Sequence, residues 1–144
     1  MVKVKIVCVG KLKENYLKDA AAEYCKRLSR FCKLDLCELP ERATLAQEAE
    51  EIKKQLRGRV FVLAVEGKQR TSEEFAGEIG AACDSGAELT FVIGSSCGLH
   101  ESVKAGAQLV SFSKMTFPHQ LMRVILLEQI YRAFMINAGA EYHK

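Results

Sequence analysis

Short apolar runs alternate along the chain with longer segments in which apolar residues recur at three- and four-residue intervals. The short runs have the length and β-branched content of strands, and the longer segments have the periodicity of amphipathic helices. Strands are expected at 2–9, 34–39, 60–65, 89–94 and 109–112, and helices at 13–30, 43–56, 71–84, 100–108 and from 118 onward. Such an alternation predicts an α/β fold with a mostly parallel sheet flanked by helices.

Length and composition favour one domain spanning residues 1–144. The hydrophobic share of 49% is enough for a core, and 144 residues leave little room for a second one. The net charge of +3 permits a nucleic-acid partner without requiring one. We expect no signal peptide and no membrane span, because no apolar run approaches the roughly 18 residues that a spanning helix needs.

Six cysteines raise the question of disulfides or a metal site. The chain has no C-x-x-C pair, and its three histidines show no zinc-ligand spacing with the cysteines. We therefore expect reduced structural thiols, no metal and a cytoplasmic location, since the cytosol keeps thiols reduced. A Cys/His metal protein stays open as a less favoured alternative.

Three loops leave the carboxyl ends of predicted strands, where open parallel sheets bind their ligands. They are VEGK at 65–68, GSSCGLH at 94–100 and SKMTFPH at 113–119. The chain lacks both G-x-G-x-x-G after its first strand and G-x-x-x-x-G-K-[ST], which argues against a Rossmann dinucleotide site and a P-loop. The glycines of the second loop are as typical of a tight turn as of a binding loop.

The last predicted helix is apolar on every side between residues 121 and 136, so we expect it to be buried. The sheet can cover only one face, which predicts a homodimer whose partner helix covers the rest. His119 and Arg123 share a face at its amino end. Glu128 and Arg132 form a second i,i+4 pair, either an ion pair within the helix or an arginine facing the dimer groove.

The C-terminal tail ends in Tyr142, His143 and Lys144. Such a tail is either frayed and inert or an aromatic platform with a proton acceptor and a phosphate contact. Between 112 and 144, four basic residues stand against two acidic ones, a balance of +2 that holds most of the net charge. That balance suits a polyanion such as RNA.

The segments FVIGSSCGLH, LVSFSKMTFPHQLMRVILLEQIYRAF and the final YHK closely resemble the ribosomal RNA large subunit methyltransferase H family, a group within the SPOUT class. The likeness begins at VKIVCVGKLKENY and covers nearly the whole chain. It implies a SPOUT-type α/β fold with a C-terminal trefoil knot, a homodimer and S-adenosyl-L-methionine as the cofactor. The implied acceptor is N3 of a pseudouridine in the helix 69 hairpin of 23S rRNA, within the assembled ribosome.

The resemblance also implies roles for individual residues. The cofactor contacts fall on Leu63, Gly94, Phe112, Ser113, Lys114, Met115, Thr116 and Phe117. His119, Arg123 and Lys144 are expected to bind RNA. His143 is the candidate base, and the resemblance implies that it and Tyr142 lie near the acceptor nucleotide across the dimer interface. Arg123 and Arg132 are expected to stabilise the anion of the base or to bind phosphate. Which subunit supplies the base stays open.

Two positions depart from the family pattern. Ser95 stands where relatives usually have a second glycine, and Glu141 where many have proline. A positive φ at position 95 would cost a serine on the order of 1 kcal/mol, so we expect Ser95→Gly to bind cofactor equally well or better. The alternatives left open are a methyltransferase of another RNA and a non-enzymatic RNA-binding module of the same fold.

Overall fold

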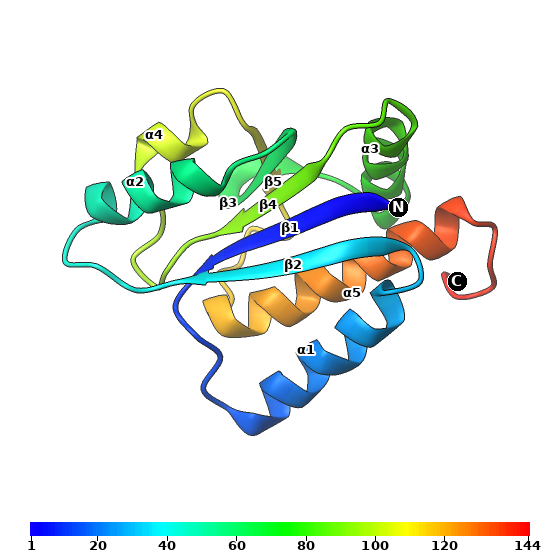
Figure 1. Ribbon diagram of the computed structural model, residues 1–144, viewed down its shortest axis with the longest axis horizontal. Helices are drawn as coiled ribbons and strands as arrows, with labels where there is room; N and C mark the ends of the chain where they lie inside the picture. Colours follow the sequence, from blue (N-terminus) through cyan, green and yellow to red (C-terminus); the bar gives the residue numbers. More distant parts are fainter.

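Five parallel strands form one sheet in the order β2-β1-β4-β3-β5 in the computed structural model, which describes residues 1–144 (Figure 1). The strands are β1 (Val2–Val9), β2 (Cys32–Leu39), β3 (Arg59–Gln69), β4 (Leu89–Ile93) and β5 (Gln108–Ser111). The helices are α1 (Asn15–Leu28), α2 (Leu45–Gln55), α3 (Ser72–Asp84), α4 (Glu101–Lys104) and α5 (His119–Asn137). The predicted parallel α/β architecture is confirmed.

The helices cover both faces of the sheet (Figure 1). α1, α3 and α5 pack on one face, over a core cluster of 22 buried residues, and α2 and α4 pack on the other, over a cluster of 7. β4 lies in the middle of the sheet, and all of its residues are buried, as a continuous apolar run predicts.

α5 lies between α1 and α3, so that its flanks are covered within the chain. Leu126, Leu127 and Ile130 are fully buried, which confirms the prediction of a buried helix. Because α1 and α3 cover the flanks of α5, the apolar character of this helix no longer requires a partner helix to bury it. Leu121 remains exposed near the amino end.

Several element boundaries differ from the sequence prediction. β3 does not end at residue 65 but runs on to Gln69, because Lys68 and Gln69 pair with β5 beyond an irregularity that follows Leu63. Gly67 is needed there, since a Cβ would come within 2.7 Å of the Leu109 backbone. α4 is only one turn long, and Pro118 precedes α5 as its N-cap instead of lying in its first turn.

Capping boxes begin two of the helices. Thr71 and Glu74 form the box that opens α3, as the T-x-x-E pattern of the sequence indicates. A second box, formed by Thr44 and Gln47, opens α2. The T-x-x-Q pattern in the sequence was a usable signal for the second box, and we had not used it.

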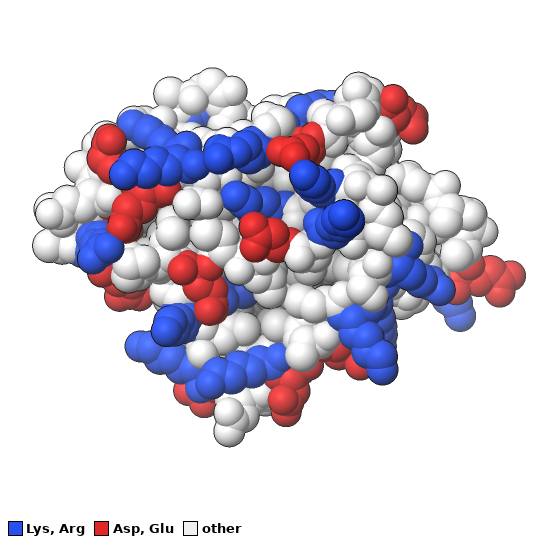
Figure 2. Space-filling model, in the orientation of Figure 1, with Lys and Arg blue, Asp and Glu red and all other residues white.

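All six cysteines are free thiols. No group of three or more His, Cys, Asp or Glu side chains is arranged to hold a metal ion. None of the helices combines the length and the apolarity needed to cross a bilayer. On the face shown in Figure 2, basic and acidic side chains are interspersed, so this face offers no uniformly basic surface to a polyanion.

Candidate functional site

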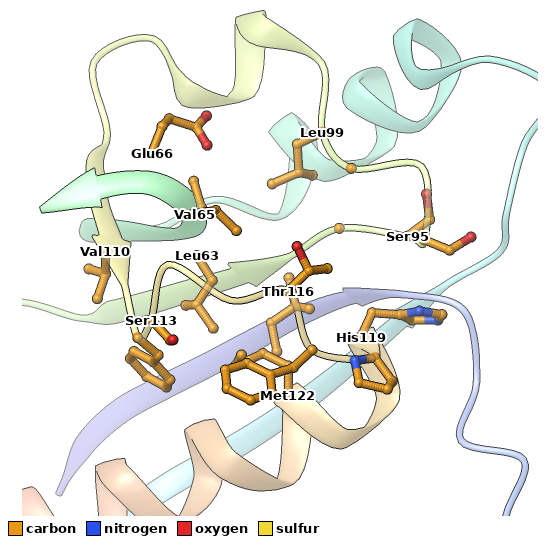
Figure 3. A pocket seen from close by; sticks show the side chains of 18 of the residues that line it. Leu63, Val65, Glu66, Ser95, Leu99, Val110, Ser113, Thr116, His119 and Met122 are labelled. Carbon is orange, nitrogen blue, oxygen red and sulfur yellow. The ribbon is translucent and has the colours of Figure 1, made fainter. Parts of the chain in front are cut away.

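A cavity of about 560 Å³ opens at the carboxyl ends of β4 and β5, beside the irregular stretch of β3 that follows Leu63 (Figure 3). Its walls come from the segments 63–66, 93–99 and 110–119, with Lys104 and Met122 completing them. These segments include parts of all three predicted loops, so the strand-end argument located the cavity correctly. Its size is typical of a small-molecule or cofactor site.

Most residues expected to contact a cofactor line this cavity. Leu63, Gly94, Phe112, Ser113, Met115, Thr116 and Phe117 are among the lining residues. Lys114 is the exception and does not line it. His119, expected to bind RNA, lies instead in the cavity wall at the start of α5 (Figure 3).

The inner wall of the cavity is apolar. Leu63 from β3 and Met122 from α5 meet there with Phe112, which follows β5 (Figure 3). The Phe112 ring packs edge-on against Phe75 of α3, with 5.9 Å between ring centroids. Phe75 belongs to the core and is 3% exposed, so this wall is anchored in the core rather than in a loop.

The loop after β4 is closed on itself at the cavity. A Cβ on Gly94 would come within 2.6 Å of the Gly98 carbonyl oxygen and 2.7 Å of Leu99 Cγ. The Gly98 N–H donates to the Ser95 carbonyl oxygen at 2.9 Å, and the two residues form an isolated antiparallel bridge. Only glycine fits at position 94 while the loop keeps this shape.

The Ser95 side chain is hydrogen-bonded, and its backbone is not in the left-handed region. No residue other than glycine has positive φ, so the concern about a left-handed Ser95 was wrong. The Ser95 hydroxyl donates to the buried Glu48 carboxylate of α2 at 3.3 Å and accepts the Cys97 N–H at 3.3 Å. The other Glu48 oxygen accepts the Arg42 N–H at 3.0 Å. Ser95 therefore ties the loop to α2.

The loop after β5 is shaped by its own serines. The Ser111 hydroxyl donates to the Ser113 carbonyl oxygen at 2.9 Å, and the Ser113 hydroxyl accepts the Met115 N–H at 3.0 Å. Met115 itself is 73% exposed. The loop thus presents backbone groups and small hydroxyls to the cavity, with one large apolar side chain at its outer edge.

An ion pair lies in the cavity wall. Lys104 Nζ of α4 donates to the Glu66 carboxylate of β3 at 2.7 Å. This hydrogen bond holds the pKa of Glu66 below its ordinary value and raises that of Lys104. The residues are 38 positions apart. Glu66 belongs to the predicted loop at 65–68, whereas nothing in the sequence pointed to Lys104 as a cavity residue.

Arg123 lies beneath the cavity end of α5 and not on the surface. Its guanidinium donates to the Glu38 carboxylate of β2 and, at 2.9 Å, to the Gly10 carbonyl oxygen. Only 2% of the side chain is exposed. This burial and pairing argue against the expectation that Arg123 binds RNA, because a buried and paired guanidinium is not free to contact a phosphate.

A second polar site, the tail cluster, comprises Glu73, Glu128, Arg132, Tyr142 and His143. Arg132 Nη2 donates to Glu128 at 3.0 Å, which confirms the ion pair within the helix. Arg132 Nη1 lies 3.0 Å from His143 Nδ1, and His143 Nε2 contacts the Glu73 carboxylate. The Tyr142 hydroxyl donates to Glu128 at 2.7 Å.

The tail is therefore docked rather than frayed. Tyr142 packs edge-on against Tyr131 with 5.0 Å between ring centroids, and the Arg132 guanidinium lies 4.8 Å from the Tyr142 ring centroid. Burial, followed by the bond to Glu128, raises the pKa of Tyr142 to about 12. Its phenol stays protonated at neutral pH, so it serves as a ring and a donor and not as a base. Lys144 is exposed at the end.

The tail cluster does not line the cavity of its own chain. Met122 is the last cavity residue of α5, and Arg132 follows it by ten residues. At 1.5 Å per residue the two Cα atoms are about 15 Å apart along the helix axis. Direct proton transfer needs contacts of about 3 Å, so the two sites of one chain are separate.

Comparison with known proteins gives a match along nearly the whole chain. A family model described as "Predicted SPOUT methyltransferase" matches residues 2–143. "Ribosomal RNA large subunit methyltransferase H" of Lactobacillus helveticus is 52% identical, over 98% of this chain and 99% of the relative. The protein of the same name from Streptococcus equi subsp. zooepidemicus is 51% identical, over 99% of each chain.

Solved structures share the fold at low identity. A methylase family protein from Neisseria gonorrhoeae superposes with a TM-score of 0.59 at 11% identity, over 99% of this chain and 87% of that one. TrmJ from Z. mobilis superposes with a TM-score of 0.53 at 12% identity, over 92% of this chain and 70% of that one. At such identities the likeness concerns the arrangement of strands and helices alone.

Proposed function

The chain belongs to the SPOUT methyltransferase family, and on that premise we propose that it methylates N3 of a pseudouridine in the helix 69 hairpin of 23S rRNA. The methyl donor is S-adenosyl-L-methionine, and the substrate is the assembled ribosome, which places the protein in the cytoplasm. The observation that carries the proposal is the cavity itself, formed by loops that the family resemblance assigns to cofactor binding in a chain 52% identical to a named relative.

The cavity residues fit the proposed cofactor. Leu63, Phe112 and Met122 offer apolar surface for a purine ring, while the backbone of 113–117 and the hydroxyls of Ser113 and Thr116 offer hydrogen bonds. The tight closure at Gly94 keeps side chains out of this space. When bound, the cofactor supplies a methyl group that its sulfonium already activates, so the protein's main task is alignment.

The amino end of α5 adds a positive potential to the cavity. His119 lines the cavity as the first residue of α5, and the first turn has no acidic residue and no side-chain cap. The free N–H groups of this turn carry the positive end of the helix dipole. That potential suits the carboxylate of an amino-acid group.

We propose a homodimer in which the tail cluster of one subunit completes the cavity of the other. The separation of about 15 Å between Met122 and Arg132 keeps the two sites of one chain apart. Of the five exposed large hydrophobic residues, Val65, Met115 and Leu121 belong to the segments around the cavity. A partner's α5 and tail, docked there, would cover these residues and bring His143 to the acceptor nucleotide.

RNA contact is assigned to fewer residues than the sequence suggested. Lys144 and the Arg132 guanidinium remain candidates, His119 contributes from the cavity wall, and Arg123 is excluded by its burial. The interspersed charges in Figure 2 support recognition of a shaped ribosomal surface over general binding of a polyanion.

The test is transfer of labelled methyl from S-adenosyl-L-methionine to ribosomes that lack this modification, followed by mapping of the labelled nucleotide. Label on N3 of one helix 69 pseudouridine is the expected result. Label elsewhere would instead favour a methyltransferase of another RNA. No transfer and no cofactor binding would favour the RNA-binding module. Naked 23S rRNA, as a parallel substrate, is expected to be labelled poorly.

Subunit mixing tests the shared site. A cavity variant (Gly94→Val) and a tail variant (His143→Ala) should each be inactive as homodimers. After random mixing, half of the dimers are mixed, and each holds one intact site, so about a quarter of wild-type activity should return. If cavity and tail of the same chain work together, mixing restores nothing. Placing both substitutions in one subunit gives the converse control.

A further inference from the structure

The imidazole of His143 is held from both sides by residues of different elements. Arg132 of α5 lies 3.0 Å from Nδ1, and the Glu73 carboxylate of α3 contacts Nε2. Figure 1 shows the tail turning back beyond the carboxyl end of α5. The nearby charged groups are Glu128 of α5 and, in the tail, Glu141, Lys144 and the chain terminus.

These two contacts fix the tautomer of the neutral ring. A guanidinium can only donate, so Nδ1 must be the nitrogen that accepts from Arg132. The ring proton then lies on Nε2 and is donated to Glu73. The nitrogen with the free electron pair is Nδ1, on the side of Arg132.

We propose that Glu73 is a positioning residue for the methyl transfer, which holds the His143 ring with Nδ1 as the proton acceptor and stabilises the imidazolium that forms. This role rests on the proposed function. Carboxylates act on catalytic histidines in the same way elsewhere, orienting the ring and compensating its charge without taking the proton. Glu73 can orient the ring because it belongs to α3, whereas Arg132 belongs to α5 and His143 to the tail.

The step balances as follows. The N3 proton of the pseudouridine passes to Nδ1, and the N3 electron pair forms the new bond to the methyl carbon. The pair of the broken S–CH₃ bond stays on sulfur, which becomes a neutral thioether. The positive charge lost by the sulfonium is thereby matched by the imidazolium, which lies against Glu73.

Arg132 occupies the place that the substrate N–H must take. In the free protein its Nη1–H group donates to Nδ1, as the N3–H group would. Glu128 holds the rest of the guanidinium through Nε at 3.2 Å and Nη2 at 3.0 Å, and the Tyr142 hydroxyl fixes Glu128 in turn. When the base enters, the displaced Nη1–H group is left beside it and can donate to the base oxygen that gains charge.

The first measurement is the ring tautomer of His143 by two-dimensional ¹H–¹⁵N NMR of the free protein at a pH where the ring is neutral. The chain has only three histidines, and a His143→Ala spectrum assigns the signal. We expect the Nε2–H tautomer, with an Nε2 proton protected by the carboxylate in the wild type and lost to exchange in Glu73→Ala. A ring protonated on Nδ1 overturns the proposal.

The second measurement is methyl transfer to ribosomes by Glu73→Ala and Glu73→Gln. General base catalysis contributes about 10²–10⁴-fold, and Glu73 acts on it indirectly, so we expect kcat to fall about ten- to a hundredfold in Glu73→Ala. The KM values for cofactor and ribosomes should change less than about threefold. Glu73→Gln keeps an acceptor without the charge, so its kcat should lie between wild type and Glu73→Ala. The control is Glu50→Gln, an exposed carboxylate on α2.

The outcomes separate this role from the function on which it rests. An active wild type with unchanged kcat in Glu73→Ala overturns the positioning role alone. A loss of kcat accompanied by an equal loss of cofactor affinity or thermal stability also overturns it, because Glu73 would then be merely structural. A wild type that transfers no methyl group overturns the proposed function and this role together.

Discussion

Two arginines on the same helix are used in opposite ways. Arg123 and Arg132 each pair with a glutamate, but Arg123 is 2% exposed and Arg132 is 24% exposed. The first is bonded to β2 and to the loop after β1, and the second to its own helix and to the tail. The buried arginine ties α5 to the sheet, whereas the partly exposed one keeps one side open to solvent.

The difference extends to the surroundings of each arginine. At the Arg123 end the cavity combines apolar side chains and glycine with hydroxyls and one ion pair, which suits binding. At the Arg132 end, titratable groups from α3, α5 and the tail form one network, which suits the handling of protons and charge. A methyl transfer needs both kinds of site, and one chain holds them apart.

The largest expected effect comes from exchanging each arginine for methionine. Arg123→Met leaves Glu38 without its cation, and removing one partner of a buried pair costs about 3–5 kcal/mol of unfolding free energy. We expect about 3 kcal/mol, since Glu38 is 35% exposed and keeps some solvation. Arg132→Met should cost about 1 kcal/mol or less, while methyl transfer should fall strongly. Urea unfolding measures both costs.

A second variant separates the two causes of the stability loss in Arg123→Met, which are the broken ion pair and the changed packing. Adding Glu38→Gln to Arg123→Met removes the stranded charge and should restore part of the lost stability. If Arg123→Met and Arg132→Met destabilise the protein equally, the proposed contrast between the two ends of α5 fails.

The next effect concerns the cavity alone. Gly94→Ala places a Cβ 2.6 Å from the Gly98 carbonyl oxygen, so the loop must open. Overpacking of this kind costs about 1–3 kcal/mol, and we expect cofactor affinity to fall about ten- to a hundredfold by titration calorimetry. The matched control is Gly77→Ala on α3, where no atom lies within 4 Å of the new Cβ. Equal affinity in both variants would show that the loop can move freely.

Periodicity and strand-end topology predicted much of this molecule. The parallel sheet, the buried α5 and the three cavity loops follow from patterns that lie within single segments, where neighbours in sequence determine the outcome. The knot and the dimer, which the family resemblance implied, stay predictions.

Pairings between distant segments were not predictable in the same way. The family resemblance implied an RNA contact for Arg123, yet its hydrogen bonds go to residues 85 and 113 positions away in its own chain. Likewise, nothing in the sequence brings Glu73 to His143, 70 positions apart. Such contacts depend on how the elements pack, which periodicity does not encode.

A smaller effect is expected at Ser95, and it reverses the expectation from the sequence. Ser95→Gly removes the donor to buried Glu48 and the acceptor for the Cys97 N–H group. We expect a loss of about 1 kcal/mol in unfolding free energy and slightly weaker cofactor binding. Ser96→Gly, on the same loop, controls for the added backbone freedom. Cofactor binding by Ser95→Gly that equals or exceeds wild type would show that the tie to α2 is irrelevant to the cavity.

The smallest effect belongs to the ion pair in the cavity wall. Because Lys104 lowers the pKa of Glu66, the pair stabilises the fold above the unfolded-state pKa of Glu66. That contribution is lost as the pH falls through the lower, folded-state pKa. The Glu66 side chain is 56% exposed, so Lys104→Met should change the unfolding free energy by less than about 1 kcal/mol at pH 7.

The pH and salt dependence of that small difference shows whether charge is its cause. The gap between wild type and Lys104→Met should shrink as the pH falls through the lowered pKa of Glu66. It should also shrink in high salt, which screens exposed pairs. A gap that is independent of pH and salt would mean that the Lys104 stem stabilises the wall by packing. In that case the charge of the Lys104–Glu66 pair would not contribute to stability at the cavity end, and the contrast with the charged tail cluster would be sharper.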